Sequence, residues 1–123
     1  RPVTVFGDGT AARDYVYVDD VVDAFVRAGQ LRGTAGGTYN IGTGLQTTVT
    51  EVHRLISAAL GSSAAPQHAP ARVGELRAIA LDTTSARTEL GWRPAVGIGE
   101  GIERTVGWLR TALAPEPAAA VGA

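Results

Sequence analysis

The feature that most constrains the fold is the segment of residues 3–20, in which two short extended runs flank a glycine-bearing loop. Residues 3–6 and residues 15–18 are rich in β-branched and aromatic side chains, which predicts two strands. Side chains alternate between the two faces of a strand. The side chains that share a face are Thr4 and Phe6 on one side, and Arg13, Tyr15 and Tyr17 on the other.

This arrangement brings an aromatic ring and a guanidinium to the two ends of one turn, a combination that suits a nucleotide. A base offers a flat face on which an aromatic ring can stack. A diphosphate offers paired anionic oxygens, which match the forked donors of Arg better than the single charge of Lys. The alternative is a surface hairpin with a Gly-Asp-Gly turn at residues 7–9, and spacing alone favours neither interpretation.

A helix is expected directly after the second strand. Asp19 and Asp20 are candidate N-caps, because their carboxylates can accept the unpaired N–H groups of the first turn and oppose the positive end of the helix dipole. The helix is predicted to run to about Gln30. Its expected buried stripe consists of Val21, Val22, Phe25 and Ala28.

A third strand is predicted at residues 38–41, and two glycines, Gly42 and Gly44, follow it. These glycines do not make a dinucleotide fingerprint. The position where a third glycine would stand is Thr47, and the next helix begins later.

The next helix has a start and a stop signal of its own. Thr48 and Glu51 form a capping box, and Gly61 is a C-terminal stop. Its expected buried face consists of Val49, Val52, Leu55, Ile56, Ala59 and Leu60.

The rest of the chain alternates loops and helices. The predicted segments are a linker at 62–71 with an extended piece at 67–69, extended chain at 77–81, a short helix from about Thr83 to Leu90, a turn in which Trp92 anchors packing, and a last helix at about 98–113. The stripe of that last helix is Ile98, Ile102, Val106, Leu109 and Leu113. Together these elements predict one small α/β domain of about four helices and short strands over residues 1–113, and a disordered tail at 114–123.

Four segments resemble those of a known family, and they occur in the family's order. They are Phe-Gly-Asp-Gly at residues 6–9, Arg-Asp-Tyr-Val-Tyr-Val-Asp-Asp at 13–20, Tyr-Asn-Ile-Gly at 39–42, and Arg-Val-Gly-Glu at 72–75 followed by Leu-Gly-Trp-Arg-Pro at 90–94. From residue 2 to about residue 110 the chain is similar to the carboxyl-terminal, substrate-binding part of the NAD-dependent epimerase/dehydratase family. These are extended short-chain dehydrogenases that act on sugar nucleotides. The chain looks most like the UDP-glucose 4-epimerases; dTDP-glucose dehydratases, GDP-mannose dehydratases and UDP-glucuronate decarboxylases share much of the layout.

The resemblance implies a binding site for a UDP-sugar. In it, Thr4 and Phe6 lie at the base, Arg13 and Arg72 contact the diphosphate, and Tyr15 and Glu75 lie nearby. Glu75 stands where the family most often has Asp, an acid that accepts from a ribose hydroxyl. Asn40 either bonds to the loop that holds Arg13 or reaches a phosphate, and both roles are open.

Catalysis in this family uses NAD and a Tyr-x-x-x-Lys pair, and this chain contains no Lys. The resemblance therefore implies that the catalytic groups and the NAD-binding Rossmann half lie upstream of Arg1 and are absent here. We expect no catalytic and no cofactor-binding residue in this chain, no activity from the chain alone, and a homodimer for the full-length enzyme. The alternative is a noncatalytic nucleotide-sugar-binding module or a truncated relic.

The composition limits other functions. The net charge is -1, with 12 acidic and 11 basic residues and no basic cluster, so we expect no nucleic-acid partner. No apolar run has the length of a membrane helix. There is no cysteine, and His53 and His68 lack carboxylates at ligand spacing, so no metal site is expected. No secretion signal is visible, which makes a cytoplasmic location the expectation.

Overall fold

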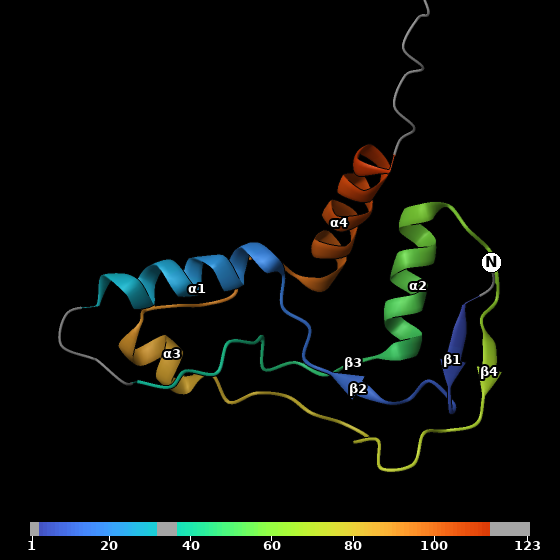
Figure 1. Cartoon of the computed structure of the whole chain (residues 1–123), viewed down its shortest axis with the longest axis horizontal. Helices are drawn as coiled ribbons and strands as arrows, with labels where there is room; N and C mark the ends of the chain where they lie inside the picture. The colour runs from blue at the N-terminus through green and yellow to red at the C-terminus, as the bar shows by residue number, and fades with distance from the viewer. Residues whose placement is uncertain (1–2, 32–36, 114–123) are drawn as a thin grey trace, which may run out of the picture.

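The structure is a computed structural model that describes residues 3–31 and 37–113. Within these residues the chain forms a small α/β fold with four helices and short strands, as predicted (Figure 1). In chain order the elements are β1 (Thr4–Phe6), β2 (Ala12–Arg13), α1 (Val18–Gln30), β3 (Thr47–Thr48), α2 (Val49–Leu60), β4 (Gln67–Ala69), α3 (Thr84–Glu89) and α4 (Ile98–Ala112).

The strands form two small sheets. β1 pairs in parallel with β4, so that Phe6 lies opposite Ala69. β2 pairs antiparallel with β3, and Ala12 lies opposite Thr48 while it also bridges to Ala78 in parallel. The predicted extended piece at 67–69 is therefore confirmed, and the chain after β4 runs beside the amino-terminal strands.

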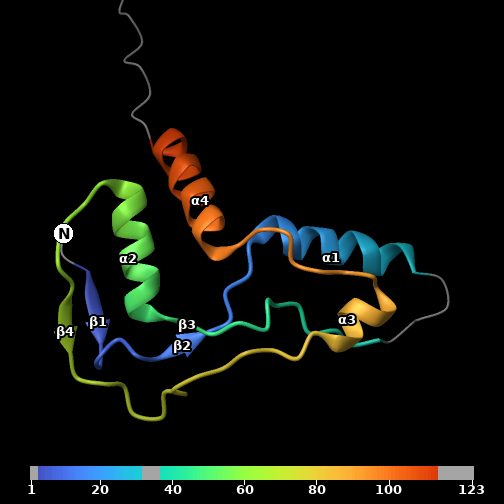
Figure 2. The ribbon, with the colours of Figure 1, turned by 180° about the vertical axis from the view of Figure 1, so that it is seen from behind.

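The helices gather at two places (Figures 1 and 2). α1 and α3 lie at one end of the molecule, β1 and β4 lie at the other, and α2 and α4 pack against each other between them. None of the helices in the described part of the chain has the length and apolar character needed to span a membrane.

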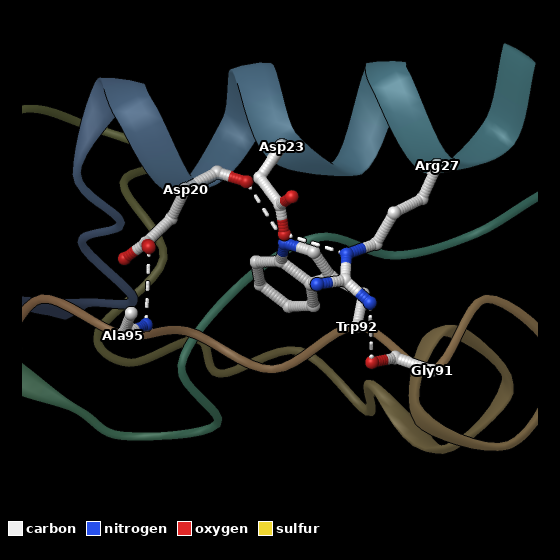
Figure 3. Close-up of polar contacts among 6 residues, drawn as sticks. All are labelled: Asp20, Asp23, Arg27, Gly91, Trp92 and Ala95. Atoms are coloured by element: carbon white, nitrogen blue, oxygen red, sulfur yellow. Dashed lines mark hydrogen bonds and ion pairs between the residues drawn. The ribbon is translucent and has the colours of Figure 1, made fainter.

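The core lies between α1 and α3 and is centred on Trp92, whose side chain is 0% exposed. The predicted packing role of this residue is confirmed. The indole Nε1–H donates to the Asp20 carbonyl oxygen at 2.8 Å (Figure 3). The other core residues are Ala24, Ala86 and Leu90, with Val16, Leu31, Tyr39 and Ile41 packed against them.

The predicted N-cap role of Asp19 and Asp20 is wrong. α1 begins at Val18, with Tyr17 as its N-cap residue, so both carboxylates lie inside the first turn. Asp20 is buried, and its carboxylate accepts the backbone N–H of Ala95 at 3.0 Å (Figure 3). It also accepts the backbone N–H of Val96 at 3.0 Å. The acid therefore anchors the loop between α3 and α4 and does not cap its own helix.

The predicted buried stripe of α1 is also wrong. Val22 and Phe25 are 53% and 75% exposed, whereas Asp20 and Ala24 are buried. Arg27 attaches the same side of α1 to the loop before Trp92. Its side chain pairs with Asp23 at 2.7 Å and donates to the Gly91 carbonyl at 3.0 Å (Figure 3). Polar anchoring to the Trp92 loop thus decides which side of α1 faces the protein.

Two predicted strands are absent from the described residues. Residues 15–17 make no ladder, because the β2–β3 pairing ends at Arg13 and α1 begins at Val18. Residues 38–41 are not a strand either. Tyr39 and Ile41 pack against the core, so side-chain packing rather than strand pairing holds this segment.

The start and stop signals of α2 are confirmed. The Thr48 hydroxyl oxygen accepts the Glu51 backbone N–H at 3.1 Å, and Gly61 adopts a left-handed φ of 67°. Its predicted apolar face, however, is only half-buried, and no residue of α2 is fully buried.

α4 follows the prediction within one residue, but only part of its predicted stripe is covered. Val106 is buried, whereas Leu109 and Leu113 are exposed. The predicted disordered tail at 114–123 lies outside the described residues.

Candidate functional site

The candidate site begins at the carboxyl end of β1, where the Phe6 ring is 41% exposed. Pairing of β1 with β4 brings the loop after β4 against this ring. The Arg72 guanidinium carbon lies 4.0 Å from the ring centroid, within the distance of a cation–π contact. Phe6 and Arg72, which are far apart in the sequence, therefore lie together as predicted for a nucleotide site.

Arg13, at the end of β2, reaches the same loop. Its Nη2 lies 3.3 Å from Glu75 Oε1, and its Nη1 donates to the carbonyl oxygens of Leu76 and Ala12, each at 2.8 Å. The Ala12 backbone N–H also donates to the Arg77 carbonyl at 2.8 Å. The end of β2 thus contacts the loop at residues 75–77 both through the Arg13 side chain and through the backbone.

A hollow of about 350 Å³ lies between these groups. Three of the residues predicted to bind substrate line it, namely Phe6, Arg72 and Glu75, whereas Arg13 does not. The rest of its lining is Gly7, Asp8, Thr10, Ala11, Ala71, Leu76 and Arg77. It therefore combines an aromatic ring, two guanidinium groups and two carboxylates.

Sequence reasoning missed two charged residues of this hollow, Asp8 and Arg77. Thr10 donates its hydroxyl and its backbone N–H to Asp8, which lowers the pKa of that carboxyl, and the nearby charge of Arg77 lowers the pKa further. For Arg77, the sequence feature that could have indicated it is its short distance from Arg72, which places two cations on one loop.

The other predicted site residues lie elsewhere. Thr4 lies on β1 and does not line the hollow. Tyr15 lines a different hollow. The Asn40 side chain donates to the Asp82 carbonyl oxygen at 3.1 Å, so it is bonded neither to the loop that holds Arg13 nor to a group of the site. The sequence did not predict this partner.

The hollow beside Tyr15 is larger, about 620 Å³, but its lining is mostly apolar. Its one charged lining residue among the described residues is Asp19. The lining consists of Tyr15, Val16, Tyr17, Val18, Asp19, Val52, Val96, Gly97, Ile98, Gly101, Ile102, Thr105 and Trp108. It offers no cation to a phosphate, so the smaller hollow is the better candidate for an anionic ligand.

Asp14, a residue to which sequence reasoning gave no role, follows β2 and ties it to two distant segments. Its carboxylate accepts the Thr43 hydroxyl at 2.6 Å, the backbone N–H groups of Thr43 and Gly44 at 2.8 Å each, and that of Leu81 at 3.2 Å. Burial raises the pKa of the Asp14 carboxyl, but these hydrogen bonds together outweigh burial and hold it below its ordinary value.

The chemistry that this arrangement supports is binding. Guanidinium groups can hold a diphosphate, and the Phe6 ring can hold a flat base. Within residues 3–31 and 37–113 no three His, Asp or Glu side chains gather as a metal site would require. Gly44 leads into β3 and not into a helix, and the glycines at the start of α4 follow a loop and not a strand, so the described residues lack the strand–turn–helix unit that holds a dinucleotide.

Comparison with known sequences places the chain among enzymes of nucleotide sugars. The family model described as GDP-mannose 4,6 dehydratase matches residues 1–105. UDP-glucose 4-epimerase of Mycolicibacterium smegmatis is 51% identical over 112 residues, which are 89% of this chain and 35% of that protein. dTDP-glucose 4,6-dehydratase of Streptomyces griseus is 36% identical over 107 residues, which are 86% of this chain and 32% of that protein.

Solved structures give the same result. UDP-glucose 4-epimerase of Thermotoga maritima, determined with UDP-glucose, has a TM-score of 0.82 and 41% identity over 92% of this chain and 36% of that one. MoeE5, in complex with UDP-glucuronic acid and NAD, has a TM-score of 0.86 and 33% identity over 92% of this chain and 38% of that one. The chain spans about a third of the length of the curated relatives it matches.

Proposed function

Because this chain belongs to the GDP-mannose 4,6-dehydratase family of NAD-dependent epimerases and dehydratases, we propose that it forms the substrate-binding part of a nucleotide-sugar 4-epimerase. The proposed substrate is a UDP-hexose, with UDP-glucose first. The relative of highest identity among those compared and the structure determined with UDP-glucose both support this choice.

The observation that carries the proposal is the contact between Phe6 and Arg72 at one hollow, with Arg13 paired to Glu75, which lines the same hollow. In the proposed complex the base lies against the Phe6 ring, with Thr4 at the rim. Arg72 and Arg13 hold the diphosphate, since guanidinium groups bind paired phosphate oxygens in a forked geometry. Glu75 lies beside Arg13, at the side of the hollow where a ribose would follow the base.

The chemical step is assigned to residues outside this chain. The chain has three Tyr but no Lys to lower the pKa of a phenol. NAD, which this family uses, does not fit the described residues, because none of their strands leads directly through a glycine turn into a helix, and we assign no step to it here. We therefore propose that the chain alone is inactive and works within a longer protein that carries NAD.

The surface of α1 supports this assignment. Val18, Val22, Phe25 and Val26 form one apolar stripe and are all more than half exposed, at 62%, 53%, 75% and 51%. Apolar stripes of this size on a helix usually face protein. An autonomous binding module, the second candidate function, would expose this stripe to water, which disfavours it.

Calorimetric titration of the protein that contains this chain tests the proposal. We expect UDP to bind, and to bind more tightly than dTDP. A preference for dTDP would instead favour a dehydratase similar to that of Streptomyces griseus. We also expect no turnover of UDP-glucose by the chain alone with added NAD, and measurable turnover would refute the assignment of catalysis to other residues.

A pair of arginine variants makes the binding test specific. Arg72→Gln removes the cation at the hollow and should weaken UDP binding at least about tenfold, the loss of one charged contact. Arg54→Gln removes an equal charge from the exposed face of α2, where Arg54 pairs with Glu51, and should leave UDP binding unchanged. Equal losses in the two variants would contradict the proposed site.

A further inference from the structure

The backbone of Arg77 is attached to β2, although the residue lies on the exposed loop after β4. Its carbonyl oxygen accepts the Ala12 backbone N–H at 2.8 Å, and the Ile79 backbone N–H donates to the Ala12 carbonyl at 3.2 Å. Ala78, the residue between them, forms a parallel bridge with Ala12. The end of β2 therefore fixes the point from which the Arg77 side chain extends.

The Arg77 side chain itself is not used by the fold. It is exposed and lines the same hollow as Arg72. Within residues 3–31 and 37–113 it makes no hydrogen bond and no ion pair, so its five N–H donors are available to a ligand. The Arg13 guanidinium, by comparison, is bonded to the loop at residues 75–76 and does not line the hollow.

Asp8 indicates on which side the Arg77 guanidinium lies. Asp8 lines the same hollow from the loop after β1, where its carboxylate accepts two hydrogen bonds from Thr10. These bonds lower the pKa of the Asp8 carboxyl, and the charge of Arg77 lowers that pKa further. Exposed charges are screened beyond about 10 Å. The guanidinium must therefore extend to the Asp8 side of the hollow and not away from it.

An acid at this place works against an anionic ligand, because Asp8 repels a diphosphate. A guanidinium nearby reduces this repulsion, and its forked donors match paired phosphate oxygens. The other cation that lines the hollow, Arg72, lies 4.0 Å from the Phe6 ring centroid. Arg72 and Arg77 thus give the hollow two cations that no ion pair in the described part of the chain occupies.

We propose that Arg77 is a further ligand-binding residue, which contacts the diphosphate of the nucleotide sugar beside Arg72. This inference rests on the proposed function and adds a residue to its site. Two simpler roles make different predictions. A residue that only compensates the charge of Asp8 has no effect on binding once Asp8 is neutral. An exposed loop charge without a role has no effect on binding at all.

The test is calorimetric titration of the protein that contains this chain with UDP and with uridine, which lacks phosphate. Arg77→Gln removes the charge, and Arg77→Lys keeps the charge without the fork. Asp8→Asn removes the opposing charge and keeps the acceptor for Thr10, and a variant with Asp8→Asn and Arg77→Gln completes the cycle. Arg87→Gln is the matched control, because Arg87 is an exposed arginine on α3, at the other end of the molecule from β1 and β4 (Figure 1).

We expect Arg77→Gln to weaken UDP binding about fivefold to tenfold, as for one hydrogen bond to a charged group that water partly replaces, and to leave uridine binding unchanged. Arg77→Lys should lose less. In the Asp8→Asn background, Arg77→Gln should weaken UDP binding by at least the same factor. Arg87→Gln should lose nothing. The urea unfolding midpoint of Arg77→Gln should match the wild type, because the substitution keeps the backbone bonds to Ala12.

Three results would overturn the inference: unchanged UDP binding in Arg77→Gln, equal losses for UDP and uridine, or no loss from Arg77→Gln in the Asp8→Asn background. UDP binding by the wild type, and its weakening by Arg72→Gln, test the proposed function separately. A wild-type protein that binds neither UDP nor dTDP would overturn the proposed function, and this inference with it.

Discussion

Substitution of Asp14 by Asn is expected to destabilise the protein more than any other single-atom change near the site. The carboxylate accepts four hydrogen bonds, two at each oxygen, from Thr43, Gly44 and Leu81. An amide can still accept the two from Thr43, but its NH₂ group must then face the N–H groups of Gly44 and Leu81. The variant therefore loses the two hydrogen bonds from Gly44 and Leu81 to a charged acceptor, and these two N–H donors then face the N–H donors of the amide.

The magnitude follows from these contacts. A hydrogen bond to a charged group contributes about 1.5–3 kcal/mol, and Asp14 is only half-buried, so water recovers part of the loss. We therefore expect Asp14→Asn to lower the free energy of unfolding by about 2–4 kcal/mol, a large share of the stability of a small domain. The assay is urea unfolding of the protein that contains this chain, followed by circular dichroism.

Asp8→Asn is the matched control. Asp8 accepts its hydrogen bonds at Oδ1 alone, from the backbone and the hydroxyl of Thr10, two residues away. Asn retains that acceptor and opposes no donor, so the unfolding midpoint should fall much less than in Asp14→Asn. A loss in Asp8→Asn as large as in Asp14→Asn would refute the argument that the long-range contacts of Asp14 stabilise the fold.

Two further predictions concern acid and the core. The pKa of Asp14 is lowered in the folded state, so its contribution is fully present above its ordinary value of 3.8 and is lost as the pH falls through the folded value. The difference in unfolding free energy between wild type and Asp14→Asn should therefore shrink between neutral pH and about pH 3, and a constant difference would contradict the assignment. Trp92→Phe removes the bond to the Asp20 carbonyl and leaves a cavity, so it should cost about 2–4 kcal/mol in urea unfolding. Trp108→Phe is its control, because Trp108 is 65% exposed and should cost little; equal costs would argue against the core described here.

The parts of the fold that the sequence predicted correctly depend on neighbouring residues. Thr48 and Glu51 are three residues apart, and the cap between them forms within one turn whatever surrounds it. Gly61 ends α2 for an equally local reason, because its left-handed φ of 67° favours glycine. The order of the motifs was sufficient to predict the fold class. It was also sufficient to place Phe6 and Arg72 in one site, since Phe6 ends β1 and Arg72 follows β4, with which β1 pairs.

The errors concern contacts between distant segments. Periodicity shows that α1 has an apolar stripe, but it does not show which side faces the rest of the chain. The buried residues Asp20 and Trp92 decide that side, and the bond from the Trp92 indole to the Asp20 backbone carbonyl spans 72 positions of the sequence. Similarly, residues 15–17 have the composition of a strand but no partner strand at that position, and a strand requires a partner to pair with.

Arg13 and Asp14 explain why the site and the fold depend on the same two residues. They are neighbours at the end of β2, so their side chains leave the backbone in opposite directions. Arg13 holds the loop at residues 75–76, while Asp14 holds residues 43–44 and 81 on the other flank. The loop that carries Arg72 is therefore tied to one strand end through Arg13, and that strand end is itself held in place by Asp14. A substitution at Asp14 should for this reason weaken UDP binding as well as stability, although Asp14 does not line the hollow and its carboxylate accepts all four of its hydrogen bonds from the protein.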